Sequence, residues 1–223
     1  EIINDIMTND LGQTATFEPT DYTTWEYAFT VNKKINSKKL LEGIASASPF
    51  IPRFTNTGEF RFDVIKETYN HTTPSIKIEK ADCISWSAKR TDIEEVFTKI
   101  ELKYNWSYIL EEFKDTVSYK ITDAGILPED ANGNNDYEQF YYGLAYDDSD
   151  STLIVDSDRG KYIRDHGTAK SFAKWLLRWH CNQHLKITVK LPLKYLNIEV
   201  GSLLSFEKLG DANPFGINYG HYH

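Results

Sequence analysis

The chain has 223 residues and a formal net charge of −8, and it is 40% hydrophobic and 14% aromatic. This content is typical of a globular protein with a buried core and excludes an intrinsically disordered chain. No run of 18 apolar residues occurs, so the sequence predicts no membrane-spanning segment.

The first part of the chain, residues 1–70, predicts a small α+β domain. Apolar residues at three- and four-residue steps indicate helices there, and apolar residues that alternate with polar ones indicate strands. The expected elements are a helix over 2–11, a strand over 25–31, a helix that is capped by Ser37, and a hairpin of strands 50–54 and 59–65.

Residues 71–209 predict a second domain that consists mainly of antiparallel strands. In its clearest strand, Ile100, Leu102 and Tyr104 alternate with charged residues, which is the pattern of a strand buried on one face. The other strands are expected over 75–78, 83–89, 117–121 and 151–155, with one helical turn over 90–94. Residues 210–223 are predicted to be an irregular tail.

A long amphipathic helix, followed by two strands, is predicted over residues 162–206. Ala169, Phe172, Leu176 and Leu177 fall on one helical face, and either Asp165 or Thr168 can cap the helix by accepting a hydrogen bond from its first turn. Beyond the helix, apolar residues alternate over 185–191 and again over 196–206. We predict that Pro192 ends the first of these strands, and that a second strand over 196–200 is followed by a turn at Gly201 that leads into 203–206, so that a hairpin unit follows the helix.

The negative charge is concentrated between Lys120 and Arg159, where no Lys or Arg occurs. Ten of the 33 acidic residues lie in this interval, which leaves 23 acidic and 25 basic residues in the rest of the chain. We interpret residues 123–158 as an acidic surface insertion. Because clustered Lys and Arg are needed to neutralise phosphates, the sequence predicts no specific binding of nucleic acid.

Two stretches contain weak candidates for metal ligands. His180 and His184 have the i, i+4 spacing that can place two imidazoles on one helical face, but a polar helix end is the favoured interpretation because the sequence shows no third ligand. Asp147 and Asp150 stand in an oxygen-rich stretch that lacks the central glycine of a calcium loop, so a solvated acidic loop is favoured over a calcium site. The prediction is that the protein holds no metal or cofactor.

Catalytic patterns are absent from the sequence: we find no nucleophile elbow, phosphate-binding loop or dinucleotide fingerprint. Four aromatic residues can stack on sugar rings, although aromatics in strands more often pack in a core or an interface. These possible ligand-stacking residues are Trp106, Tyr108, Tyr141 and Tyr142.

The order of these pieces resembles the hub proteins of bacteriophage tails, which include baseplate hubs and tip attachment proteins. The resemblance covers residues 37–206. It consists of a helix before a hairpin over 37–63, an Arg-Thr pair followed by a strand over 84–104, and a closing unit over 161–206. Within the closing unit, Ser202 follows Gly201 where these hubs usually have aspartate.

The resemblance implies a structural virion protein that is made in the cytoplasm of a bacterial host and is not an enzyme. The expected β-rich domain is a partial, tail-tube-like barrel, and the expected assembly is a homo-oligomer, with a trimer favoured, that contacts other tail proteins and surrounds the path of the DNA. The family transfers no catalytic residues to this chain.

Two alternatives remain open from the sequence. One is a carbohydrate- or receptor-binding module of a virion or cell surface, which would use the four stacking aromatics for host attachment. The other is a cell-wall hydrolase whose site is not visible as a pattern.

Overall fold

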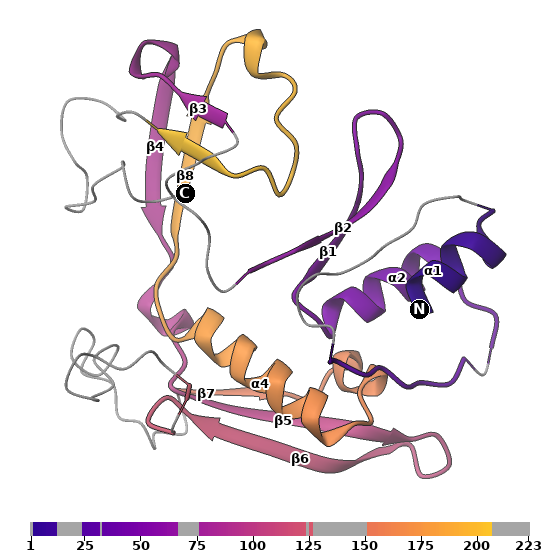
Figure 1. Ribbon diagram of the computed structural model, residues 1–223. Coiled ribbons are helices and arrows are strands. Elements are labelled where there is room, and N and C mark those ends of the chain that lie inside the picture. The colour runs from indigo at the N-terminus through magenta and orange to yellow at the C-terminus, as the bar shows by residue number, and fades with distance from the viewer. Residues whose placement is uncertain are drawn as a thin grey trace. The chain divides into compact units, whose positions relative to one another are not determined.

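The protein contains both helices and strands and divides into two compact units, as a computed structural model shows (Figure 1). The structure describes residues 2–12, 24–31, 33–66, 76–123, 125–126 and 151–206. Unit 1 comprises residues 1–50 and 92–183, and unit 2 comprises residues 51–91 and 184–223. The predicted α+β class is confirmed. Both units draw on two separate parts of the chain, so this division differs from the boundary predicted at residue 70.

Unit 1 is organised around a three-stranded sheet with the order β6–β5–β7. β5 (Lys99–Ser107) pairs antiparallel with β6 (Glu112–Lys120) and parallel with β7 (Thr152–Val155). The predicted alternation in β5 is confirmed, because Ile100, Leu102 and Tyr104 are all buried. The strand predicted over 117–121 is longer than expected and begins at Glu112.

The long helix α4 (His166–His180) packs on the buried face of this sheet, as Figure 1 shows. The predicted apolar face, Ala169, Phe172, Leu176 and Leu177, is buried, and Thr168 and Ala173 are buried as well. Together with the inward side chains of β5, the apolar ones form the hydrophobic core of unit 1. The helical period of the sequence therefore identifies the core-facing side correctly.

Two shorter helical regions precede the sheet in unit 1. α1 (Ile2–Asp5) continues into the π-helix η1 (Ile6–Asp10). The predicted cap of α2 (Ser37–Ser46) is wrong by one residue: Ser37 is the first residue of the helix, and the cap is Asn36, whose Oδ1 accepts a hydrogen bond from the Lys38 N–H at 2.9 Å. A 3-10 helix, η5 (Asp158–Tyr162), leads into α4.

The strand predicted over residues 25–31 is wrong, because this segment belongs to no helix and to no sheet. Its backbone is instead bonded to the region at the start of α4. The Glu26 N–H donates to Thr168 Oγ1 at 2.8 Å, and the Ala28 N–H donates to the Tyr162 carbonyl at 3.1 Å. The alternating aromatics thus reflect packing on a helix: Trp25 contacts Phe172 edge-on, with ring centroids 6.2 Å apart.

Asp165 caps α4, which settles the predicted choice between Asp165 and Thr168. Its Oδ2 accepts the Thr168 N–H at 2.6 Å, and this bond is the main reason that the pKa of Asp165 lies below its ordinary value. A carboxylate whose pKa falls on folding stabilises the folded state above its unfolded pKa, and this contribution is lost as the pH falls through the folded pKa.

We expect Asp165→Ala to lower the thermal unfolding midpoint by a few degrees at pH 7. The difference from the wild type should begin to shrink as the pH falls below the ordinary pKa of an unfolded aspartate, about 3.9, and should vanish once the pH has passed below the lower pKa of the folded carboxyl. Asp165→Asn is the matched control, since it keeps a capping oxygen without the charge. A difference that is constant from pH 7 to pH 2.5 in scanning calorimetry would contradict this account.

Unit 2 contains three sheets of two strands each among the described residues. The predicted hairpin is confirmed as β1 (Phe50–Phe54) and β2 (Phe60–Val64). β4 (Ser85–Arg90) pairs antiparallel with β8 (Leu185–Lys190), and β3 (Ile76–Ile78) pairs parallel with β9 (Leu204–Phe206). Unit 2 also contains the 3-10 helices η2 (Lys80–Asp82) and η6 (Leu193–Tyr195), whereas η3 (Ile93–Glu95) belongs to unit 1.

The hairpin predicted over residues 185–206 is wrong. β8 pairs with β4 and β9 pairs with β3, so the two strands that follow α4 do not pair with each other. Pro192 has no N–H to donate to a ladder, and η6 follows it directly. Residues 196–200 form no strand. The consequence is an arch between β8 and β9.

Most of the strand pairing is antiparallel, as predicted, since the longest ladders are those of β5 with β6 and of β4 with β8. The partial, tube-like barrel stays a prediction. None of the helices in the described ranges is long and apolar enough to cross a membrane.

Candidate functional site

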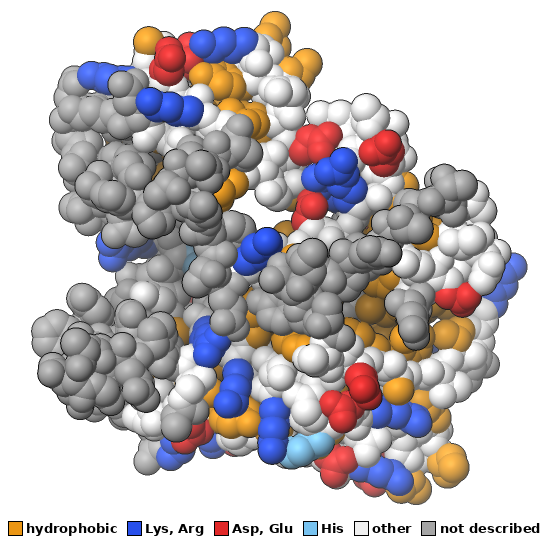
Figure 2. Space-filling model, in the orientation of Figure 1, with side chains coloured by type: hydrophobic (Ala, Val, Ile, Leu, Met, Phe, Trp, Pro, Cys, Tyr) orange, Lys and Arg blue, Asp and Glu red, His pale blue; other side chains and the backbone are white. Residues whose placement is uncertain are grey.

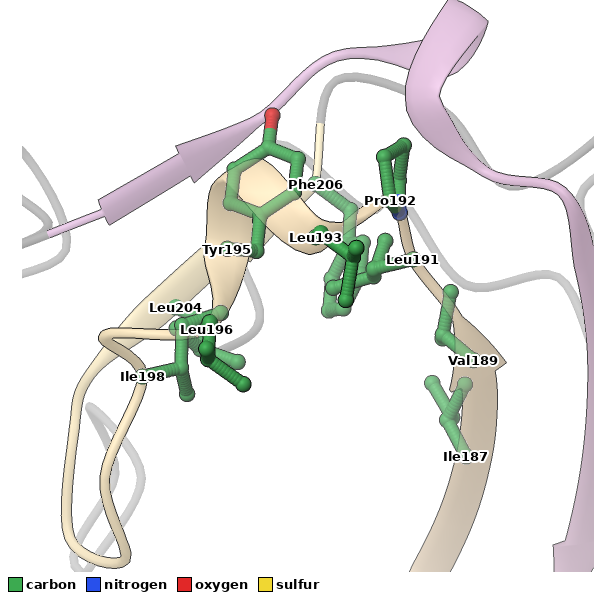
Figure 3. Close-up of a pocket in the computed structure, with 10 residues that line it drawn as sticks. All are labelled: Ile187, Val189, Leu191, Pro192, Leu193, Tyr195, Leu196, Ile198, Leu204 and Phe206. Carbon is green, nitrogen blue, oxygen red and sulfur yellow. The ribbon is translucent and has the colours of Figure 1, made fainter.

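An apolar groove of about 400 Å³ lies in unit 2, under the arch between β8 and β9. Figure 3 shows side chains of β8 on one side of the groove and side chains of the 196–204 segment on the other. Its lining residues are Ile187, Val189, Leu191, Pro192, Leu193, Tyr195, Leu196, Ile198, Leu204 and Phe206.

The wall formed by β8 follows from the two-residue period of a strand. Ile187 and Val189 are half-buried and line the groove, whereas Lys186, Thr188 and Lys190 are exposed. The predicted division of this strand into an apolar and a polar side is confirmed. Because a two-stranded sheet has little stability of its own in water, the apolar side of β8 needs further cover.

An ion-pair network holds the far wall of the groove in place. Arg53 of β1, whose side chain is only 14% exposed, pairs through Nε with Asp63 Oδ2, and its Nη1 lies 2.6 Å from Glu199 Oε2. Glu199 Oε1 also accepts the Asn56 N–H at 2.8 Å, which is the main cause of the lowered pKa of Glu199. The hairpin β1–β2 is thereby tied to the segment between η6 and β9.

Gly201 completes this network because it lets the backbone approach Asp63. Its φ is +84°, and a Cβ atom at this position would lie 2.7 Å from Asp63 Oδ2. The left-handed conformation and the close contact both require glycine. The turn that the sequence predicts at Gly201 is therefore present, although it does not join two paired strands.

A second charged cluster holds the crest of the arch. Asp82 Oδ2 accepts a hydrogen bond from the Tyr195 hydroxyl at 2.6 Å and lies 2.6 Å from Lys194 Nζ. The bond from Lys194 contributes most to lowering the pKa of Asp82. The crest and the far wall of the arch are thus fixed by charged or polar groups, while the groove is lined mainly by apolar side chains.

Several large apolar side chains stand out from the surface around the groove. Leu193 is 85% exposed and Leu196 is 76% exposed, and Val200, in the same segment, is also exposed. Figure 2 shows hydrophobic side chains gathered at the top of the view, where the arch lies. We call Leu193, Leu196 and Val200 the apolar rim. An apolar groove with such a rim is typical of a surface that binds protein.

The predicted stacking residues are only partly within the described structure. Trp106 lies beneath Lys161, whose Nζ is 4.3 Å from the ring centroid, and Trp106 contacts Phe113 edge-on at 4.9 Å. The Tyr108 hydroxyl accepts the Thr30 N–H at 3.0 Å. Both rings therefore contact other parts of unit 1. Tyr141 and Tyr142 lie outside the described residues, so the four-residue platform stays a prediction.

Of the four weak candidates for metal ligands, His180 and His184 lie within the described residues, and Asp147 and Asp150 do not. α4 ends at His180, whose ring lies edge-on to Phe97 with centroids 6.0 Å apart. His184 lies beyond the helix end and donates its backbone N–H to Thr91 Oγ1 at 2.9 Å, so the two imidazoles do not share a helical face. Asp147 and Asp150 lie outside the described residues. Within the described ranges, no three His, Cys, Asp or Glu residues are grouped as metal ligands.

A row of basic residues follows the outer side of α4, a feature that counting charges along the sequence misses. Lys170, Lys174 and Arg178 are spaced by four residues, and Figure 2 shows Lys and Arg side chains in a row over this helix. Lys174 Nζ lies 5.1 Å from the Tyr119 ring centroid, and Arg178 donates from Nη2 to the Gly125 carbonyl at 2.8 Å. Two of the three cations thus bind neighbouring parts of unit 1.

Sequence reasoning did not identify the groove, because its walls come from β8 and β9, and each of these strands pairs with a partner far away in the chain. The feature of the sequence that could have pointed to the groove is the high frequency of Leu and Ile in residues 185–206. No protein-family model matches the chain, and no curated protein is significantly similar to it in sequence.

Proposed function

We propose that the protein is a structural component of a bacteriophage tail tip or baseplate hub, located in the virion, and that it has no catalytic role. In this proposal it assembles into a homo-oligomer, with a trimer favoured, and contacts other tail proteins. The β-rich part of the chain would contribute to a partial, tube-like barrel around the path of the DNA. The family resemblance of residues 37–206 motivates this assignment.

One observation supports an assembly role above all: unit 2 combines two-stranded sheets with an exposed apolar surface. A soluble monomer rarely exposes several large apolar side chains next to an apolar groove. The described side chains that line the groove are aliphatic or aromatic, and the hydroxyl of Tyr195 among them is hydrogen-bonded to Asp82. Such a surface stabilises an association by removing apolar area from water.

The double variant Leu193→Asp/Leu196→Asp tests this role. If the apolar rim is part of the interface between copies, burying two carboxylates there should weaken association about a hundredfold or more. Solution mass at several protein concentrations, with negative-stain imaging, measures the effect. For the wild type we expect a closed ring.

Ile109→Asp is the matched control, because Ile109 is 92% exposed and lies in unit 1, in the turn between β5 and β6. This variant should assemble as the wild type does. Equal association of the wild type and the double variant at every concentration would show that the rim is not the interface. A wild type that is monomeric throughout the range would count against the hub assignment.

A further inference from the structure

We propose that the outer edge of β8 binds an extended peptide segment of a partner protein, in which apolar residues alternate with acidic ones. The segment would add a strand to the β4–β8 sheet and place its apolar side chains in the groove. The site is the β8 wall of the groove and not the apolar rim, so this inference does not depend on association between copies. It rests on three features: the open edge, the two unlike faces of the sheet, and the charge along β8.

β8 has one edge to which no other strand is bonded among the described residues. Just before the strand, the His184 carbonyl points to the β4 side, where it accepts the Thr91 N–H at 2.9 Å. Because the backbone groups of successive residues alternate between the two edges of a strand, the even-numbered residues of β8 face β4. The N–H and C=O groups of Ile187 and Val189 therefore point to the outer edge. Such a row of backbone groups is a template for an added strand.

One face of the β4–β8 sheet is apolar and borders the groove. Ile187 and Val189 are half-buried on this face and stand opposite Ala88 and Trp86 of β4. Figure 3 shows the side chains of Ile187 and Val189 directed into the groove that they line. A strand added at the outer edge would therefore place every second side chain beside them. Apolar side chains at these positions would be removed from water and stabilise the complex.

The opposite face of the same sheet is basic. Lys186 and Lys190 are exposed there, and neither is ion-paired with another described residue. Lys186 also stands directly opposite Lys89 of β4 in the register, and like charges in this position repel each other. Acidic side chains on an added strand would lie within reach of both β8 lysines and offset this repulsion. The second set of alternate residues in the bound segment is therefore acidic.

The same charges disfavour a second copy of β8 as the added strand. Antiparallel pairing of two copies, centred on Thr188, would put Lys186 of each copy opposite Lys190 of the other. Lysine on an edge strand is a common means of preventing such pairing between copies. An acidic segment converts this repulsion into attraction, so the occupant that the edge favours comes from a different protein.

The first test uses the full chain and a fluorescein-labelled peptide of about eight residues, in which Glu and Val alternate and which matches the roughly 20 Å length of the strand. Fluorescence anisotropy measures the dissociation constant. We expect Lys186→Glu/Lys190→Glu to weaken binding at least about tenfold and to create binding of a peptide of alternating Lys and Val. Circular dichroism checks that the variants are folded.

Lys33→Glu/Lys34→Glu is the matched control, because it makes the same change of charge at two exposed residues of unit 1. This variant should bind the Glu–Val peptide as the wild type does. Equal affinity of the two double variants for that peptide would overturn the proposal, as would a wild type that does not bind it.

The second test needs no protein variant, and it separates strand addition from other binding. Two further peptides carry N-methyl groups either on every Val or on every Glu. Because only one of these two sets of N–H groups can face β8, one methylated peptide should bind at least about tenfold more weakly and the other about as well as the parent. Equal affinities of the two methylated peptides would overturn strand addition. Loss of peptide binding as the protein associates with itself would show that a second copy occupies the edge, which overturns the choice of a partner protein.

Discussion

Replacing Gly160 by alanine is expected to destabilise unit 1 by about 3 kcal/mol or more. A Cβ atom at Gly160 would lie 2.0 Å from the carbonyl oxygen of Lys103 and 3.0 Å from a ring carbon of Phe113. The first of these atoms belongs to the backbone of β5, so no rotamer change can relieve the overlap. The Asn105 N–H also donates to the Ile163 carbonyl at 3.0 Å, which ties the two segments together. Either η5 or β5 must therefore move.

Urea unfolding followed by circular dichroism measures this loss. Gly167→Ala is the matched control, because it adds the same methyl group in the same unit, where the nearest atom is a side-chain oxygen of Asp165 at 3.0 Å. The control should shift the free energy of unfolding by less than about 1 kcal/mol. A Gly160→Ala protein as stable as the control would show that η5 does not cross β5 as closely as the structure indicates.

Replacing Phe172 by alanine is expected to cost about 3–5 kcal/mol of unfolding free energy, in the range measured for large-to-small changes in well-packed cores. Phe172 has no exposed surface and lies among the buried residues of α4 and β5. Its ring is stacked on Trp175, with centroids 6.1 Å apart, and contacts Trp25 edge-on. The truncation would leave a cavity and also remove both aromatic contacts.

The readout is again urea unfolding, with tryptophan fluorescence as a second probe because two of the five tryptophans touch Phe172. Lys170→Ala is the control: it lies two residues earlier on the same helix, is exposed, and should change stability by less than about 0.5 kcal/mol. If Phe172→Ala cost less than 1 kcal/mol, the packing of α4 on the sheet would have to be revised.

Local patterns were enough to predict the helix and the central strand of unit 1. The cap at Asp165, the apolar face that contains Phe172, and the alternation through Leu102 all arise from neighbours within a few residues. The segment from Trp25 to Val31 has the same two-residue alternation and is still not a strand. Alternation shows that one side is buried, but it does not say whether a sheet or a helix covers that side.

The groove could not be predicted, because its geometry depends on pairing between remote residues. Ile76 is paired with Leu204, and Trp86 is paired with Val189. Nothing in the neighbourhood of Leu193 or Leu196 indicates that the chain turns there into an arch instead of a hairpin. The network that fixes the arch is equally non-local, since Arg53 and Glu199 come from different thirds of the chain.

The chain passes from unit 1 to unit 2 and back before it ends in unit 2, and this path sets an order of folding. During synthesis, residues 51–91 emerge about a hundred residues before β8, the strand that pairs with β4. Unit 1 is complete once residue 183 has emerged and can fold while unit 2 still lacks β8 and β9. The pairing of β8 and β9 with their partners in unit 2 is then a late step of folding. This step is slow because the conformational entropy of the long intervening chain is lost before the contacts between the strands form. A folded unit 1 shortens that loop by holding residues 92 and 183 at fixed positions, so mutations that slow unit 1 should delay unit 2 as well.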